Sequence, residues 1–336
     1  MEGTVGTIAP VEMQDTAKPE GPTKIWQMIR KQMRPLKRLY YRIRAKLSDL
    51  PWEHWEQYRA HVSFLSELYL RKDGRVNLNQ LDLDIVPGCN LRCQHCTRLS
   101  PYRKGYVPVE KIVHWSETWS KKIRPNVVAL LGGEPFLHPD LPTVVRESRR
   151  IWSDSRINVL SNGLLIPQAS QEIFDVLKET KCHVHVSDHS GIDLQREKVL
   201  AGCERLKENG ISYDLSSDNK SWLALHQYDA HGTPSPCQSI PRTAWLNCLG
   251  KYCPLLTNNL LYKCTILGSI IDGVNEGSLS GQLWKEALTL NALTPDADAA
   301  TILKYFRIQE IQGCTICPDK RIQTEPRQMP PQKSAK

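Results

Sequence analysis

The stretch from residue 81 to residue 96 reads LDLDIVPGCNLRCQHC, and it places a short strand directly before three cysteines. Leu81, Leu83 and Ile85 alternate with acidic residues, a pattern that predicts a β-strand. Pro87-Gly88 then ends the strand, because proline and glycine favour turns. The cysteines therefore lie on a loop at the carboxyl end of this strand.

Cys89, Cys93 and Cys96 have the spacing C-x3-C-x2-C. Three thiolates on one short loop can bind three corners of an iron–sulfur cube and leave the fourth iron open. Disulfides between such near neighbours would close small, strained loops. Zinc is the alternative, although structural zinc sites usually have paired C-x2-C units and four closed ligands. The spacing favours an iron–sulfur cluster in a reducing compartment.

Strands and helices alternate after this loop, which predicts an α/β fold with a parallel sheet. In such sheets, functional residues gather at the carboxyl ends of the strands. The expected strands after the first cover residues 127–131, 157–160, 183–187 and 211–215, and the expected helices cover residues 109–121, 141–152, 169–180 and 193–209.

The motif Gly132-Gly133-Glu134-Pro135 follows the second expected strand. Together with the cysteine loop, it resembles the radical S-adenosylmethionine (radical SAM) superfamily. The resemblance implies a partial (β/α)6 barrel whose open iron binds S-adenosyl-L-methionine (SAM). It also implies that the glycine turn contacts the methionine part of SAM, since glycines let the backbone approach a ligand closely. Glu134 would accept from the SAM ammonium group.

The resemblance assigns other cofactor-binding residues as well. Ser161 and Asn162 end the third strand, where relatives contact the ribose hydroxyls. Ser187, followed by Asp188, ends the fourth strand at a comparable position. His95 takes a place that is usually aromatic in the family and lies close to the adenine. An ordinary strand-end turn is the alternative for residues 161–163 and 187–188, because Ser, Asn, Gly and Asp favour turns.

The resemblance further implies a mechanism. A reduced cluster donates an electron to SAM, which splits into methionine and a 5′-deoxyadenosyl radical. The radical then removes a hydrogen atom from a substrate, while the protein orients that substrate and excludes water. A low-potential donor such as flavodoxin or ferredoxin would supply the electron. The reaction type stays open among oxidation, epimerisation and related radical chemistry.

A second group of cysteines lies near the carboxyl terminus, at Cys248, Cys253, Cys264, Cys314 and Cys317. Their spacing resembles the short auxiliary-cluster module called twitch, which is related to the longer SPASM module, and implies a second [4Fe-4S] cluster. Cys264, Cys314 and Cys317 are the firmest ligands, completed by Cys248 or Cys253. Structural zinc is the alternative. Asn258-Asn259 replaces the family's turn glycine, because Asn tolerates positive φ.

The other cysteines receive simpler interpretations. Cys182 and Cys203 are expected to be small buried hydrophobic residues, and Cys237 is left unassigned. The expected organisation is a disordered segment at 1–22, a basic helical extension at 23–75, a partial barrel at 76–235, an auxiliary-cluster module at 236–320 and a disordered tail at 321–336.

Charge is concentrated near the amino terminus. The net charge is +8, and the segment from Lys24 to Lys46 holds nine Lys or Arg residues and no acid. Because the rest of the chain is nearly neutral, nucleic acid is not an expected partner. The basic segment predicts a solvated helix, with an acidic partner or an anionic membrane surface as the alternative. Neither a secretory signal nor a membrane span is apparent, so a cytoplasmic location is expected.

Three functions remain open. The first is a radical SAM enzyme that acts on a polar, sugar-type or natural-product substrate. The second is a peptide or protein maturase of the same superfamily, whose acidic leader peptide would bind the basic segment. The third is a non-catalytic iron–sulfur or zinc scaffold, which the intact cysteine and glycine motifs disfavour.

Overall fold

The computed structural model describes residues 55–189, 193–216, 222–224, 226–228, 234–248, 250–275, 279, 281–282, 284–285 and 292–324. The predicted basic helix at 24–46 lies outside the described residues. The same holds for the disorder predicted at 1–22 and for residues 325–336 of the predicted tail. The described residues from 56 onward belong to one compact unit, and the first helix described is α2 (Trp55–Ser66).

A nine-stranded sheet is the centre of this unit, with the strand order β12-β11-β10-β2-β3-β4-β5-β6 and β1 paired to β2. Strands β10 and β2 to β6 pair in parallel along this order. The bounds are β1 Tyr69–Leu70, β2 Val76–Val86, β3 Ile123–Gly132, β4 Arg156–Ser161, β5 His183–Ser187, β6 Ser212–Ser216, β10 Leu255–Thr257, β11 Leu260–Tyr262 and β12 Ala292–Leu293. The predicted mixed α/β fold with a parallel sheet is confirmed.

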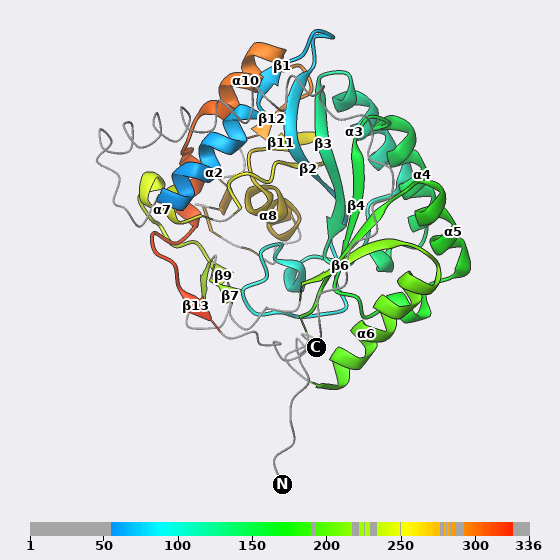
Figure 1. The fold of residues 1–336 in the computed structure, drawn as a ribbon. Coiled ribbons are helices and arrows are strands. Elements are labelled where there is room, and N and C mark those ends of the chain that lie inside the picture. Colours follow the sequence, from blue (N-terminus) through cyan, green and yellow to red (C-terminus); the bar gives the residue numbers. More distant parts are fainter. Residues whose placement is uncertain are drawn as a thin grey trace. The chain divides into compact units, whose positions relative to one another are not determined.

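Four helices connect the parallel strands and cover one face of the sheet (Figure 1). Their bounds are α3 Val109–Ser120, α4 Leu141–Ile151, α5 Gln171–Glu179 and α6 Asp193–Glu208. Pro142 stands in the first turn of α4, where its missing N–H costs nothing. These helices fall close to the predicted ranges, because each has a regular apolar stripe.

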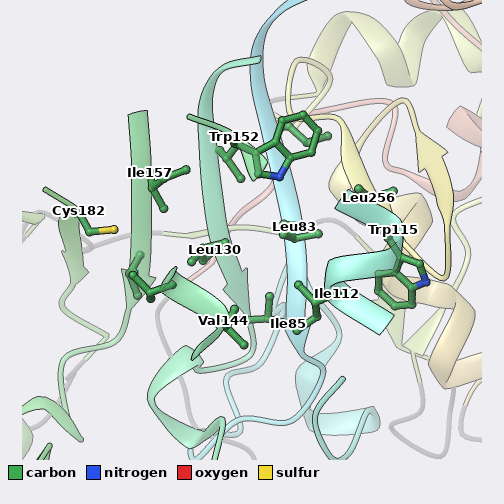
Figure 2. Close-up of a cluster of buried hydrophobic side chains, with 14 of the residues drawn as sticks. Leu83, Ile85, Ile112, Trp115, Leu130, Val144, Trp152, Ile157, Cys182 and Leu256 are labelled. Carbon is green, nitrogen blue, oxygen red and sulfur yellow. The ribbon is translucent and has the colours of Figure 1, made fainter. Parts of the chain in front are cut away.

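The core is divided between the two faces of the sheet. On the helical face, Leu83 and Leu130 pack with Trp115 of α3 and Val144 of α4 (Figure 2). Cys182 and Cys203 are buried members of this cluster, as expected from the sequence. On the other face, the alternate residues of β3 pack with β10, β11 and α8 (Thr265–Asn275). Both faces are therefore covered, as is usual for parallel sheets.

The carboxyl-terminal segment contributes to the main sheet. Strand β10 pairs in parallel with β2, where Leu255 lies opposite Asp82. A two-residue turn then leads into β11. Asn258 and Asn259 form this turn with φ of 51° and 58°, so the predicted positive φ is confirmed. Asn suits such a turn because its side chain tolerates the left-handed region.

The remaining elements are short. They are β7 Trp222–Leu223, β8 Gln227–Tyr228, β9 Pro234–Ser235, α7 Pro241–Asn247, α10 Ala299–Arg307 and β13 Gln323–Thr324, with 3-10 turns at Ser100–Tyr102, Pro135–Leu137, Ile166–Gln168 and Gln312–Ile316. Within the described ranges, the structure has no helix with the length and apolar character that crossing a membrane requires.

Candidate functional site

The cysteine loop lies at the carboxyl end of β2, on the wall of a cavity of about 740 Å³. Cys93 is buried, and Cys89 and Cys96 are half-buried. The cavity brings together most of the residues that the sequence singles out, because all of them follow parallel strands. Those lining it are Cys89, Cys93, His95, Cys96, Gly132, Gly133, Ser161, Asn162 and Ser187.

The glycine turn is packed against the backbone of the cysteine loop. A Cβ atom on Gly132 would lie 2.0 Å from the carbonyl oxygen of Val86, and one on Gly133 would lie 2.1 Å from that of Gly88. The Gly133 N–H donates to the Val86 carbonyl at 2.6 Å, and the Glu134 N–H donates to that of Gly88 at 3.1 Å. The glycines therefore let two loops of the protein approach each other, a contact that the sequence analysis did not consider.

Glu134 is fully buried and binds donors of the chain itself. Its carboxylate accepts from the Phe136 N–H at 3.1 Å, the Ser161 hydroxyl at 2.8 Å and the Asn162 N–H at 2.7 Å. Burial raises the pKa of Glu134 to about 7 in spite of these bonds. Glu134 does not line the cavity, so its contact with a SAM ammonium group stays a prediction. Its evident role is to join the ends of β3 and β4.

Asn162 connects the end of β4 to the cysteine loop. Its side-chain amide donates to the Asn90 side-chain oxygen at 2.7 Å and lies 3.8 Å from the Cys89 sulfur. Its own oxygen accepts from the Leu164 N–H at 3.1 Å. The side chain is thus held in one orientation beside a candidate ligand. A side-chain amide so placed can tune a cluster through hydrogen bonding to sulfur.

Three aromatic side chains lie together at the cysteine loop, and only His95 could be singled out from the sequence. His95 lies with its ring centroid 5.4 Å from that of His226 and 5.2 Å from that of Tyr228. The Tyr228 hydroxyl accepts from the His95 backbone N–H at 3.1 Å. Burial lowers the pKa of His226 to about 3, so this ring is neutral. No periodic pattern around residue 226 indicated these contacts.

The lining of the cavity also includes polar groups from β2, from the segment after the cysteines and from the start of α8. The Asp82 carboxylate accepts from Gln80 at 2.6 Å and from the Thr265 hydroxyl at 3.0 Å, and it lies 3.5 Å from the Arg98 guanidinium. Arg98 also hydrogen-bonds to Thr265. Cys253 lines the same cavity, where burial raises its thiol pKa to about 12. The Asp82–Arg98 ion pair is almost fully buried.

Four of the five tail cysteines line a separate, small cavity of about 20 Å³. They are Cys248, Cys264, Cys314 and Cys317. Cys253 lies instead in the large cavity, so the structure separates the two candidates that spacing left open. Cys237 is outside both linings, although its N–H donates to the Ile316 carbonyl at 3.1 Å.

Two lysines stand beside these four thiols. Lys251 and Lys263 line the small cavity, and burial lowers the pKa of each to about 8. Burial also raises the pKa of Cys248 to about 11 and that of Cys264 still further. Thiolates form in such a place only when cations compensate their charge. The lysines supply part of that charge, and a bound metal would supply the rest.

The two groups of thiols, one in each cavity, differ in the kind of cluster that they could hold. The large cavity offers three thiols on one loop and has the size typical of cofactor sites, so the residues present fit an open-iron cluster with SAM. The small cavity offers four thiols but has room for about one water molecule. In the described part of the chain, no three His, Cys, Asp or Glu side chains are arranged to hold a single metal ion.

Fold and site together place three thiols on one loop at the carboxyl edge of a parallel α/β sheet. The family model of the Radical SAM superfamily matches residues 83–219, which include the cysteine loop and the glycine turn. Over this segment, which is less than half of the chain, the sequence is similar to the radical SAM superfamily. The family implies a [4Fe-4S] cluster and SAM.

Curated relatives agree with this family over part of their length. The GTP 3′,8-cyclase of Clostridium acetobutylicum is 28% identical over 107 residues, which are 30% of this chain and 32% of that protein. The GTP 3′,8-cyclase of Campylobacter jejuni is 25% identical over 151 residues, 43% of this chain and 45% of that protein. The chain thus matches less than half the length of either relative.

Solved structures give a weaker likeness. BtrN in complex with AdoMet and 2-DOIA is 14% identical with a TM-score of 0.42, covering 73% of this chain and 98% of that one. The anSMEcpe enzyme with bound AdoMet is 18% identical with a TM-score of 0.34, covering 40% of this chain and 42% of that one.

Proposed function

We propose that this protein cleaves SAM reductively at a [4Fe-4S] cluster bound by Cys89, Cys93 and Cys96, and that it acts on a polar substrate in the same cavity. The single observation that carries the proposal is the composition of that cavity. Its lining contains the three thiols and the two glycines of the turn together with the buried Asp82–Arg98 pair. Cofactor and substrate groups would therefore meet in one enclosed space.

The chain's own residues would hold and orient the cofactors. The backbone bonds from Gly133 and Glu134 fix the start of the cysteine loop against β3. Asn162 fixes Asn90 beside Cys89. Gly132, Ser161 and Ser187 form the cavity wall where the family resemblance implies contacts with SAM. When bound, cluster and SAM supply the hydrogen-abstracting radical, while the surrounding side chains exclude water.

A polar substrate is supported by the polar side chains in the lining of the cavity. Arg98 has five N–H donors, and its known partners are Asp82 and Thr265. Gln80 and Arg321 also line the cavity. Such groups bind hydroxyl, carboxylate or phosphate oxygens in a desolvated site. A sugar-type substrate fits this chemistry, and so does a nucleotide such as the GTP named in the curated relatives.

We propose a second metal centre at Cys248, Cys264, Cys314 and Cys317. An auxiliary [4Fe-4S] cluster is the first candidate, because it could accept an electron from the substrate. Structural zinc is the second, because zinc also favours four tetrahedral thiolates. Cys253 is left out of this centre, because it lines the substrate cavity.

The main proposal is tested by alanine replacement of Cys89, Cys93 and Cys96 in anaerobically reconstituted protein. With SAM and dithionite, the wild type should form 5′-deoxyadenosine, and each variant should lose this activity almost completely. Cys182→Ala and Cys203→Ala serve as matched controls, because both cysteines are buried in the core away from the cavity. Retained cleavage in all three loop variants would refute the proposal.

Metal analysis tests the second centre. Two four-iron clusters would give about eight irons per chain, falling to about four in Cys264→Ala. Cys253→Ala should keep the wild-type content, whereas Cys248→Ala should not. About four irons with one zinc would identify the centre as structural zinc. If Cys264→Ala and Cys317→Ala kept the wild-type metal content, these two cysteines would not be ligands of the second centre.

Substrate class is tested by adding GTP, amino sugars or acidic leader-type peptides to the cleavage assay. A true substrate should accelerate 5′-deoxyadenosine formation and transfer deuterium from a labelled substrate. Arg98→Gln should weaken that acceleration without abolishing the uncoupled cleavage of SAM. Acceleration by the peptides alone would favour the maturase function. If the substrate accelerated 5′-deoxyadenosine formation equally in Arg98→Gln and in the wild type, Arg98 would have no role in substrate binding.

A further inference from the structure

The cysteine loop contains a residue in an unusual backbone conformation. His95 has a φ of 59°, in the left-handed region, between Cys93 and Cys96. A side chain other than glycine is uncommon there and needs support from its surroundings. This conformation also sets the direction in which the chain enters Cys96. The orientation of the third thiol therefore depends on what keeps His95 left-handed.

Tyr228 provides that support from a strand far along the chain. Its hydroxyl accepts from the His95 N–H at 3.1 Å and also hydrogen-bonds with the side chain of Tyr102. Tyr102 closes the same loop, since its N–H donates to the Leu99 carbonyl at 2.9 Å. Leu99 is itself left-handed, with a φ of 53°. One half-buried hydroxyl thus contacts the loop before and after Cys96.

The strand that carries Tyr228 is anchored at its other end. Tyr228 pairs with Pro234 of β9, and the Gln227 side chain donates to the Pro236 carbonyl at 3.1 Å. The Ser239 N–H donates to the Thr315 carbonyl at 2.9 Å. Thr315 lies between two of the tail cysteines. The hydroxyl is therefore held in place by the hairpin and the tail together.

We propose that Tyr228 is a positioning residue that holds His95 in the left-handed conformation and so aims Cys96 into the cavity. The inference rests on the proposed function, because the loop's thiols are taken as cluster ligands. Without the hydroxyl, the His95 N–H has no acceptor in the loop, and extended conformations at residue 95 become accessible. These conformations would turn Cys96 away from the other two thiols.

The experiment uses reconstituted holoenzyme carrying Tyr228→Phe, which keeps the ring contacts with His95 and His226 and removes only the hydroxyl. Tyr69→Phe on strand β1 is the matched control, because Tyr69 is exposed. Three properties are measured: hydrogen exchange of peptides covering residues 89–102, the electron paramagnetic resonance spectrum of the reduced cluster with and without SAM, and SAM affinity.

In Tyr228→Phe we expect exchange in the loop to quicken, and SAM to bind about tenfold more weakly, as losing about 1.4 kcal/mol predicts. The spectrum should become heterogeneous. Loss of iron from a folded variant would also support the proposal. Wild-type exchange, spectrum and affinity would overturn it. A wild type whose spectrum does not respond to SAM would instead contradict the proposed function.

Discussion

The contact between the glycine turn and the cysteine loop makes Gly133→Ala a sensitive test of the site. The added methyl group would lie 2.1 Å from the Gly88 carbonyl oxygen and 2.7 Å from the Cys89 Cβ. Ordinary contacts begin at 3.4 Å, so the two loops must separate by more than about 1 Å. Both neighbours are backbone or sit directly on it, and neither can rotate away.

The cost follows from the contacts that separation would break. Overpacking costs about 1–3 kcal/mol, and the bonds from Gly133 to Val86 and from Glu134 to Gly88 contribute about 1 kcal/mol each. We therefore expect Gly133→Ala to lower the free energy of unfolding by about 3–5 kcal/mol. Because Cys89 moves with Gly88, the variant should also retain little iron after reconstitution.

Urea unfolding followed by circular dichroism, together with iron analysis, measures both effects. Gly74→Ala is the control, since nothing lies within 4 Å of its Cβ position and its φ of 82° is the sole strain. That strain should cost about 1 kcal/mol and leave the iron content unchanged. If Gly133→Ala were as stable and as iron-rich as Gly74→Ala, the contact would not matter and the reasoning would fail.

Three further predictions concern the buried charges and the tail turn. Arg103→Met leaves the fully buried Asp84 without its ion-pair partner and should lower the free energy of unfolding in urea by about 3–5 kcal/mol. Arg150→Met removes one partner of an exposed pair and should change this free energy little. Equal effects of the two variants would contradict the prediction. Asn259→Val places a β-branched residue at a φ of 58° and should cost about 1–2 kcal/mol, while Asn259→Gly should be tolerated; a Val variant as stable as the Gly variant would count against the turn assignment. Burial raises the pKa of Glu134 from 4.5 to about 7. Between these two pH values, the folded protein holds a proton that the unfolded chain has released. The contribution of Glu134 to stability should therefore fall by about 3 kcal/mol as the pH rises from 4.5 to 7. Comparing wild type with Glu134→Gln at pH 5 and pH 7.5 isolates this effect from the buried histidines, whose lowered pKa acts in the opposite direction; parallel pH dependences would refute it.

Much of the fold could be predicted from the sequence, because each of its central elements has a local signal. The strand at 127–131 is a short apolar run, the strand at 183–187 alternates valines with polar residues, and the intervening helices have regular apolar faces. The convergence of the cysteine loop, the glycine turn and Asn162 then follows from topology, since parallel strands end at one edge. What spacing could not reveal was the reason for the glycines, which depends on the distance between two loops.

Other parts of the site depend on pairings between distant residues. The three-residue strand β10 has no pattern of its own and is defined by β2, about 170 residues earlier. Tyr228 and His226 reach the loop from a segment without periodicity. Asp82 did carry a usable signal, because an acidic residue inside a strand of otherwise buried residues must find a partner. That partner, Arg98, lies two residues after the last cysteine of the motif.

Strand β10 is synthesised long after its neighbour β2, and this order affects folding during translation. During synthesis, β3 to β6 can pair in succession, but most of the other edge of β2 stays open until residues 255–257 leave the ribosome. An open apolar edge is a template for wrong pairing. A chain cut before residue 255 would therefore expose that edge permanently and should aggregate. The segment that follows residue 254 is thus needed to complete the sheet.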